Sequence, residues 1–175
     1  MAKEYIITMT AANRVGILSA VTKALSELGA DLREASQTVV RGFFTMIFSA
    51  EFPEDMDPTV ITDHLQDVCR SFGIDVNLKD AQAERDSSAS QGERFYSLRL
   101  GGDNQKGVLR KLSGTIALHR IDIAGMHAVR TKNGDGFEMV LKMAVPKGFD
   151  LDQLTKELNK AGQSFNITAD VSDYS

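Results

Sequence analysis

The chain has 175 residues and a net charge of −4 at pH 7, and hydrophobic residues make up 42% of it. This composition is typical of a soluble globular protein with one domain or two small ones. No apolar run approaches the roughly 20 residues that a membrane span needs, and the first residues lack the layout of a signal peptide. The single cysteine, Cys69, excludes an intramolecular disulfide framework and favours the reducing cytoplasm.

Charge is distributed unevenly along the chain. Residues 1–88 contain 8 Lys and Arg against 14 Asp and Glu, a net charge of −6, whereas residues 89–175 contain 12 against 10, a net charge of +2. Surfaces that bind nucleic acid are usually basic, because contacts to phosphate supply most of the affinity. The acidic first half therefore disfavours a nucleic-acid partner.

The hydrophobic period changes in a regular order along the first half of the chain. Runs of β-branched and aromatic residues predict strands, and apolar spacings of three and four predict helices. A tight turn is expected at Arg41-Gly42, and Asp57-Pro58 is a helix start signal. The predicted elements are a strand at 4–10, a helix at 14–29, strands at 31–40 and 42–52, a helix at 57–72 and a strand at 73–80.

The second half repeats this order after a polar segment at 83–92, which we interpret as a linker. The loop sequence NRVGIL at 13–18 returns as NQKGVL at 104–109. We therefore predict an α+β fold with two ferredoxin-like βαββαβ units in tandem, at 1–82 and 93–175, each an antiparallel sheet with both helices on one face. The predicted elements of the second copy lie at 95–101, 106–120, 121–132, 136–145, 150–162 and 165–171.

The sequence RGFFTMIF at 41–48 is similar to the third strand of an RNA-recognition motif. The motif needs a second aromatic ring where this chain has Thr45, and a small residue where it has Phe44. RNA platforms also need several exposed rings on a positive surface, so we discount RNA binding and predict that Phe43 is packed. Two predicted strands have apolar residues on both faces: Tyr5, Ile6, Ile7 and Met9 in the first, and Phe43, Phe44, Met46, Ile47 and Phe48 in the third. We therefore expect the helix-free face of the sheet to be covered by the other copy, a second chain or a ligand.

Each copy has a glycine at the start of its first predicted helix, Gly16 and Gly107. Glycine in a first helical turn costs about 1 kcal/mol relative to alanine, so its recurrence needs a reason. One reason is close packing of the helix start, with Asn13 and Asn104 acting as N-caps. The other is that a small ligand reaches the free N–H groups, which suit a carboxylate, while the asparagine side chain accepts a hydrogen bond from an ammonium group. One short loop could then hold both ends of an α-amino acid.

On these residues each copy resembles an ACT domain, a βαββαβ module that senses small molecules in amino-acid-regulated proteins. The resemblance is carried by the loops at 13–18 and 104–109 and by the segments ADL at 30–32 and IDI at 121–123. The run at 36–48 is similar to a hairpin of small stand-alone ACT proteins, and the tandem arrangement resembles the glycine cleavage system transcriptional repressor family. ACT domains usually have Asp at the position of Asn13 and Asn104, and this departure implies an altered ligand preference or one vestigial site.

The resemblance implies a ligand between two ACT units, contacted by the helix-start loop and by the start of the second strand. The ligand-binding residues that it implies are Asn13, Arg14, Val15, Gly16, Ile17, Leu18, Asp31, Leu32, Asn104, Gln105, Lys106, Gly107, Val108, Leu109, Asp122 and Ile123.

No catalytic constellation is visible in the sequence. His64, His119 and His127 have no second metal ligand at a useful spacing, and we expect neither an enzyme nor a cofactor. The expected partners are a free amino acid and a regulated protein, for which the resemblance implies a transcriptional activator or an enzyme of amino-acid metabolism. A ligand-free interaction module and a regulatory subunit of such an enzyme remain alternatives. We expect no membrane or nucleic-acid partner and a cytoplasmic location, and the sequence leaves a homodimer open.

Overall fold

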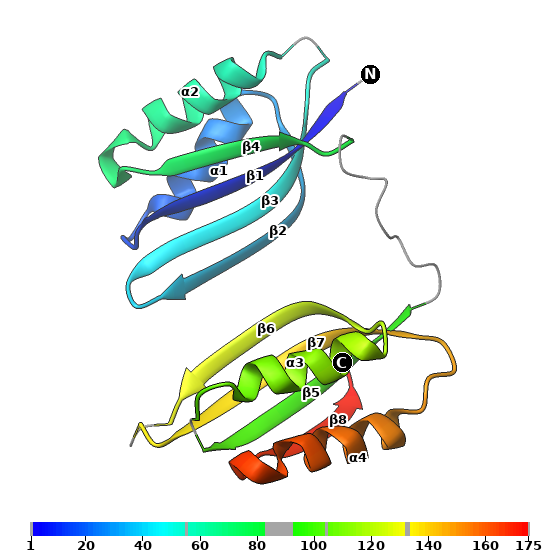
Figure 1. Cartoon of the computed structure of the whole chain (residues 1–175). Helices are drawn as coiled ribbons and strands as arrows, with labels where there is room; N and C mark the ends of the chain where they lie inside the picture. Colours follow the sequence, from blue (N-terminus) through cyan, green and yellow to red (C-terminus); the bar gives the residue numbers. More distant parts are fainter. Residues whose placement is uncertain (1, 55, 83–92, 104, 132–133, 175) are drawn as a thin grey trace. The chain divides into compact units, whose positions relative to one another are not determined.

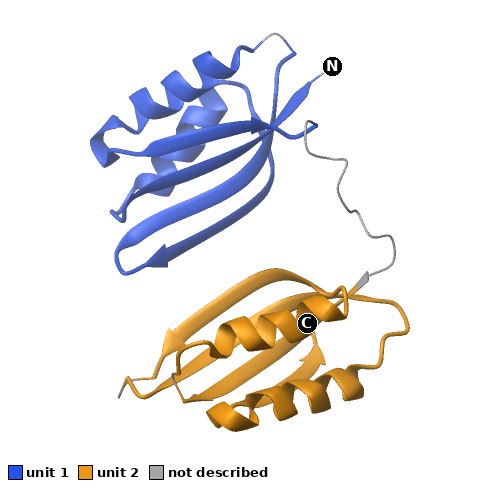
Figure 2. Ribbon diagram, viewed as in Figure 1, with its two compact units in different colours: residues 1–89 blue, residues 90–175 orange. Residues whose placement is uncertain are grey.

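The computed structural model describes residues 2–54, 56–82, 93–103, 105–131 and 134–174. The chain forms two compact units, residues 1–89 (unit 1) and 90–175 (unit 2), which Figure 2 shows in different colours. The linker predicted at 83–92 lies outside the described residues.

Unit 1 is a four-stranded antiparallel sheet in the order β2-β3-β1-β4, with its two α-helices on one face (Figure 1). The ferredoxin-like prediction is confirmed for this unit. Its elements are β1 (Lys3–Ala12), α1 (Ile17–Glu27), β2 (Asp31–Val40), β3 (Phe43–Phe52), α2 (Pro58–Val68), the 3₁₀ turn η1 (Arg70–Phe72) and β4 (Asp75–Asp80).

Unit 2 repeats the same topology, with its strands in the order β6-β7-β5-β8 (Figure 1). The predicted tandem of ferredoxin-like units is therefore confirmed. Its elements are β5 (Glu93–Asp103), α3 (Val108–Leu118), β6 (Asp122–Arg130), β7 (Gly136–Pro146), α4 (Leu151–Gly162), the 3₁₀ turn η2 (Gln163–Phe165) and β8 (Thr168–Asp173).

The core of each unit lies between the sheet and its two helices. In β1, Tyr5, Ile7 and Met9 alternate onto this side and are buried, as the period of two in a strand requires. In unit 2 the corresponding buried side chains of β5 are Leu98 and Leu100. In the central strands β1 and β3 of unit 1, the fully buried side chains are those that face the helices, whereas every residue of the edge strand β2 is exposed.

The prediction that Phe43 is packed is wrong within unit 1. Phe44 points toward the helices and is 2% exposed, whereas Phe43 points to the other face of β3 and is 67% exposed. Ile47, two positions from Thr45 on that same face, is 49% exposed. The unit's own elements therefore do not cover this face, and its expected cover by the other copy, a second chain or a ligand stays a prediction.

The signals for the hairpin turn at Arg41-Gly42 and for the start of α2 are confirmed. Arg41 and Gly42 both have positive φ, 50° and 83°, as a two-residue hairpin turn of the primed type requires. Asp57 caps α2, because its Oδ1 accepts a hydrogen bond of 2.7 Å from the Thr59 N–H. The two helices of unit 1 are shorter than predicted, since residues 14–16 form a loop and the end of the second predicted helix is the 3₁₀ turn η1.

A His–Glu pair joins the two helices in both units, with the partners exchanged. In unit 1, Nε2 of His64 on α2 lies 2.9 Å from Oε2 of Glu27 on α1. In unit 2, Nε2 of His119 at the end of α3 lies 2.6 Å from Oε2 of Glu157 on α4. Hydrogen bonds from Gln153 and then from His119 lower the pKa of Glu157 from its ordinary value of 4.5.

Because this pKa is depressed on folding, the ionised Glu157 stabilises unit 2 above pH 4.5, and the stabilisation is lost as the pH falls through the folded-state pKa. We expect Glu157→Gln to lower the free energy of unfolding at about pH 7 and to have a smaller effect at about pH 3, measured by urea unfolding. Asp170→Asn, which removes an exposed carboxylate from β8, is the control. A Glu157→Gln effect of equal size at both pH values would contradict the prediction.

Candidate ligand-binding site

The repeated glycine was expected in the first turn of each helix. In the structure it is the N-cap residue that precedes this turn. Gly16 caps α1 with φ of 94°, and Gly107 caps α3 with φ of 87°. This left-handed conformation is one that glycine adopts readily and other residues adopt at a cost. A Cβ on Gly107 would meet nothing within 4 Å, and one on Gly16 would meet only the Phe72 ring at 3.7 Å. Close packing is therefore not the reason for either glycine.

Gly107→Ala is expected to lower the free energy of unfolding of unit 2 by about 1–2 kcal/mol, because the backbone strain remains even though the space is open. Gly114→Ala on the same helix is the matched control. Gly114 lies mid-helix and a Cβ there also meets nothing within 4 Å, so alanine should raise stability by about 0.5–1 kcal/mol. Denaturant unfolding measures both, and a stabilising Gly107→Ala would contradict the assignment of strain.

Hydrogen bonds tie the helix-start loops to their own units. Asn13 is not the N-cap of α1; its N–H donates to the Gly42 carbonyl of the hairpin turn at 2.8 Å. Nη1 of Arg14 donates to the Ser71 carbonyl at 3.2 Å. In unit 2, the Asp103 carboxylate accepts a hydrogen bond of 2.7 Å from Asn166. Asn104 lies outside the described residues.

Four of the predicted residues come together in unit 2, around a pocket of about 390 Å³ between the start of α3 and the far end of β6. Its predicted members are Gln105, Gly107, Val108 and Leu109. The residues that sequence reasoning missed are Arg110, Ala128, Val129, Arg130, Phe137 and Met139.

The predicted residues at the start of the second strand do not join this pocket. Asp122 and Ile123 line a neighbouring hollow of about 510 Å³ along α3, which shares only Arg110 with the pocket. Since α3 has 11 residues, its two ends lie about 16 Å apart, and β6 begins near the second end. In unit 1, Asp31 and Leu32 likewise begin β2 after α1, and Asp31 pairs with Arg33 at 3.2 Å.

The chain reversal after α3 explains the residues that were missed. With 9 residues, β6 extends about 30 Å, so its last residues return alongside the start of α3. The element order and lengths, more than any motif, could have indicated that the end of this strand faces the glycine loop.

The pocket in unit 2 is suited to a carboxylate. None of its lining residues is acidic, and two are arginines, Arg110 and Arg130. Within the described part of the chain, neither guanidinium has an ion-pair or hydrogen-bond partner. The start of α3 adds unpaired N–H donors and the positive end of the helix dipole. Val108, Phe137 and Met139 give the remainder an apolar wall.

Unit 1 lacks these charges at the corresponding positions. Val39 pairs with Phe44 in the sheet of unit 1, as Arg130 pairs with Phe137 in unit 2. Ser19 lies two residues after the start of α1, where α3 has Arg110. The two helix-start loops therefore share their backbone form but differ in the side chains available to an anion.

Other kinds of site find no support in the described ranges. There, no three His, Cys, Asp or Glu side chains gather as a metal ion would require. Cys69 is buried, and burial raises the pKa of its thiol, which opposes a role as nucleophile. Among the helices of these ranges, none is both long enough and apolar enough to cross a bilayer.

Comparison with known proteins places these observations in a family. The UPF0237 protein of Methanosarcina mazei is 32% identical over 82 residues, which cover 46% of this chain and 89% of that protein. A protein from Galdieria sulphuraria has the same fold over the whole of both chains, with a TM-score of 0.81 and 18% identity. A candidate glycine cleavage system transcriptional repressor matches 99% of both chains, with a TM-score of 0.71 and 14% identity.

The ACT domain family matches this chain twice, at residues 5–68 and 96–163, and so covers both units. ACT domains are regulatory modules that bind amino acids. The chain belongs to the ACT domain family.

Proposed function

We propose that this protein is an amino-acid sensor that changes the state of a partner protein when a free amino acid binds. The observation that carries the proposal is the pocket of about 390 Å³ at the start of α3, where helix N–H groups and two arginines without partners in the described chain face an apolar wall. A helix start with nearby cations favours a carboxylate, and the small volume favours a small ligand.

In the proposed complex, the ligand carboxylate accepts hydrogen bonds from N–H groups next to Gly107 and pairs with Arg110 or Arg130. The side chain of Asn104 accepts a hydrogen bond from the ammonium group of the ligand, and Asn13 has the same role in unit 1. Unit 2 is the tighter site, since unit 1 has Ser19 and Val39 where unit 2 has its arginines. Glycine and serine are the first ligands to test.

Regulation requires that the ligand bind one conformation of the protein better than another. The loop and the start of the second strand lie at opposite ends of the first helix in each unit, so one small ligand that touches both needs two copies of the module. A homodimer is one way to supply the second copy. We propose a transcriptional activator or an enzyme of amino-acid metabolism as the target in the cytoplasm, and the likeness to a candidate glycine cleavage repressor supports the former.

A thermal-shift screen of the twenty amino acids tests this proposal. We expect at least one to raise the melting temperature of the wild type, and Arg130→Met to weaken its binding at least about tenfold, because a charge-assisted hydrogen bond is lost. Arg99→Met is the control, since Arg99 lies on the opposite face of the same sheet. Equal loss in both variants would contradict a site at Arg130.

The competing function is a protein-interaction module without a ligand, as a free-standing domain or as the regulatory subunit of a metabolic enzyme. A screen in which none of the twenty amino acids shifts the melting temperature favours that function.

A further inference from the structure

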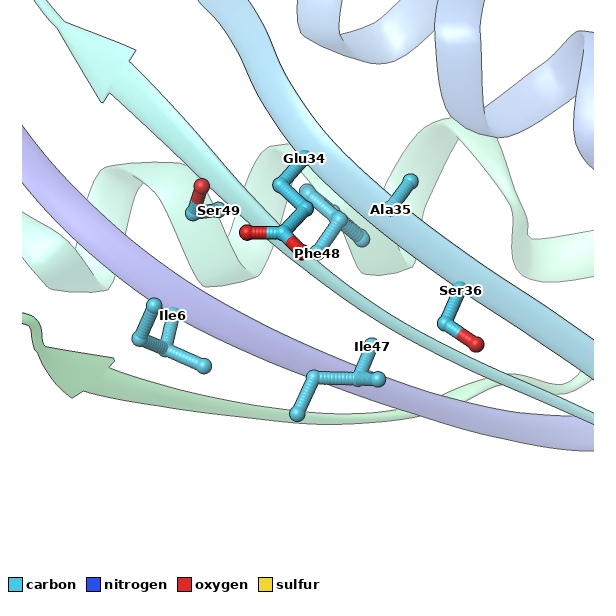
Figure 3. Close-up of a pocket in the computed structure, with 7 residues that line it drawn as sticks. All are labelled: Ile6, Glu34, Ala35, Ser36, Ile47, Phe48 and Ser49. Carbon is cyan, nitrogen blue, oxygen red and sulfur yellow. The ribbon is translucent and has the colours of Figure 1, made fainter. Parts of the chain in front are cut away.

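The helix-free face of unit 1 contains a second pocket, of about 250 Å³, in a different place from the helix-start loop. Figure 3 shows its lining, which comes from three strands: Ile6 from β1, Ile47, Phe48 and Ser49 from β3, and Glu34, Ala35 and Ser36 from β2. Ile6 and Ile47 form an apolar floor, and the two hydroxyls and the Glu34 carboxylate are its polar groups. Glu34 is the only charged residue of the lining.

A β-bulge in the edge strand aims Glu34 at this pocket. The register between β2 and β3 shifts between Leu32 and Glu34, so that Glu34 lies opposite Ser49 on the helix-free face. The extra residue, Arg33, pairs with Asp31 at 3.2 Å and with Glu51 at 2.5 Å. Glu34 is left without an ion-pair or hydrogen-bond partner among the described residues.

On the corresponding part of its sheet, unit 2 has the side-chain ammonium group of Lys142. The row of paired residues Ile6, Ser49 and Glu34 in unit 1 corresponds to Ser97, Lys142 and Gly125 in unit 2, where the same bulge recurs. The Lys142 ammonium lies 4.4 Å from the centre of the Phe95 ring and 4.5 Å from that of Tyr174. At this row, unit 2 has a cation and no acid, and unit 1 has an acid and no cation.

We propose that the pocket of unit 1 binds a small primary alkylammonium ion. The Glu34 carboxylate pairs with the ammonium group, the Ser36 and Ser49 hydroxyls accept its remaining N–H bonds, and the alkyl chain lies on Ile6 and Ile47. Zwitterionic amino acids bind poorly here, because the lining has no positive group for their carboxylate, which would lie near Glu34. The pocket is thus opposite in charge preference to the one beside Arg110 and Arg130.

The test is a titration of the full chain with n-butylammonium chloride at low salt, followed by NMR of the Ile6 and Ile47 methyl groups. We expect saturable shifts at both methyl groups with a dissociation constant in the range of about 1–10 mM, and weaker binding of n-butanol and of glycine. Glu34→Gln should weaken n-butylammonium binding at least about tenfold. Ser49→Lys, which puts the residue of unit 2 at this place, should abolish it.

Asp75→Asn is the matched control, because Asp75 is an exposed carboxylate on the opposite edge strand of the same sheet, and its binding should equal that of the wild type. Binding of n-butanol as tight as that of the amine, equal losses in Glu34→Gln and Asp75→Asn, or no saturable shift at Ile6 and Ile47 would each overturn the proposal. The amino-acid site is tested by variants of unit 2, so either proposal can fail without the other.

Discussion

Replacing Phe44 with alanine is expected to lower the free energy of unfolding of unit 1 by about 3–5 kcal/mol. The Phe44 side chain is 2% exposed and belongs to the cluster of buried residues between sheet and helices, so its removal leaves a cavity as well as lost contacts. Native-state hydrogen exchange, read by NMR at the core amides of unit 1 and unit 2 separately, measures this loss. The amides of unit 2 should keep their protection.

Phe43→Ala is the matched control, on the adjacent residue of the same strand. Because Phe43 is 67% exposed, its loss should change the free energy of unfolding by no more than about 0.5 kcal/mol. Losses of similar size in the two variants would contradict an open helix-free face and show that this face is covered in solution.

The exposure of Phe43 changes the basis on which RNA binding is rejected. An exposed ring could stack on a base, so packing no longer excludes that role. The charge of −6 over residues 1–88 and the replacement of the second motif aromatic by Thr45 still disfavour it. Titration with single-stranded RNA at low salt should give no saturable binding, and binding that is lost in Phe43→Ala would restore the RNA function.

Gly102→Ala is the second substitution expected to have a large effect, about 3 kcal/mol or more on unit 2. A Cβ at Gly102 would lie 2.3 Å from the Asn166 carbonyl oxygen and 2.7 Å from Cδ1 of Ile167. The chain between η2 and β8 lies directly against β5 at this point, so backbone and not a flexible side chain would have to move.

Gly101→Ala is the control for this prediction. A Cβ on Gly101 would lie 3.9 Å from the Phe137 carbonyl oxygen, an ordinary contact, and the variant should be close to the wild type in stability. Urea unfolding of unit 2 compares the two. If Gly102→Ala were as stable as Gly101→Ala, the close approach of residues 166–167 to β5 would be wrong.

Elements whose ends are determined by neighbouring residues, such as turn and cap residues, could be predicted from the sequence. Strand β2 was predicted with the bounds that it has, because Asp31 and the turn at Arg41-Gly42 mark its two ends. The cap at Asp57 follows from the same kind of local chemistry. The tandem fold was predictable because the period changes in the same order twice.

Features that depend on contacts between residues far apart in the sequence could not be predicted. Arg130 is 23 positions after Gly107, and only the reversal after α3 brings both to one pocket. The positive φ of Gly16 and Gly107 is a property of the turn into the helix that composition does not reveal. Phe43 and Phe44 are identical in type, and only the register of β3 decides which of them is buried.

An NMR titration of the full chain with glycine and with serine tests the sensor function most directly. If either ligand binds as proposed, the amide signals of Gly107, Val108 and Leu109 and of Arg130 will shift together and saturate at one dissociation constant. These shifts should be larger than those at Gly16, Ile17 and Leu18, because unit 1 lacks the two arginines. Saturable shifts confined to residues away from the start of α3, or no shift with any of the twenty amino acids, would contradict an amino-acid site there.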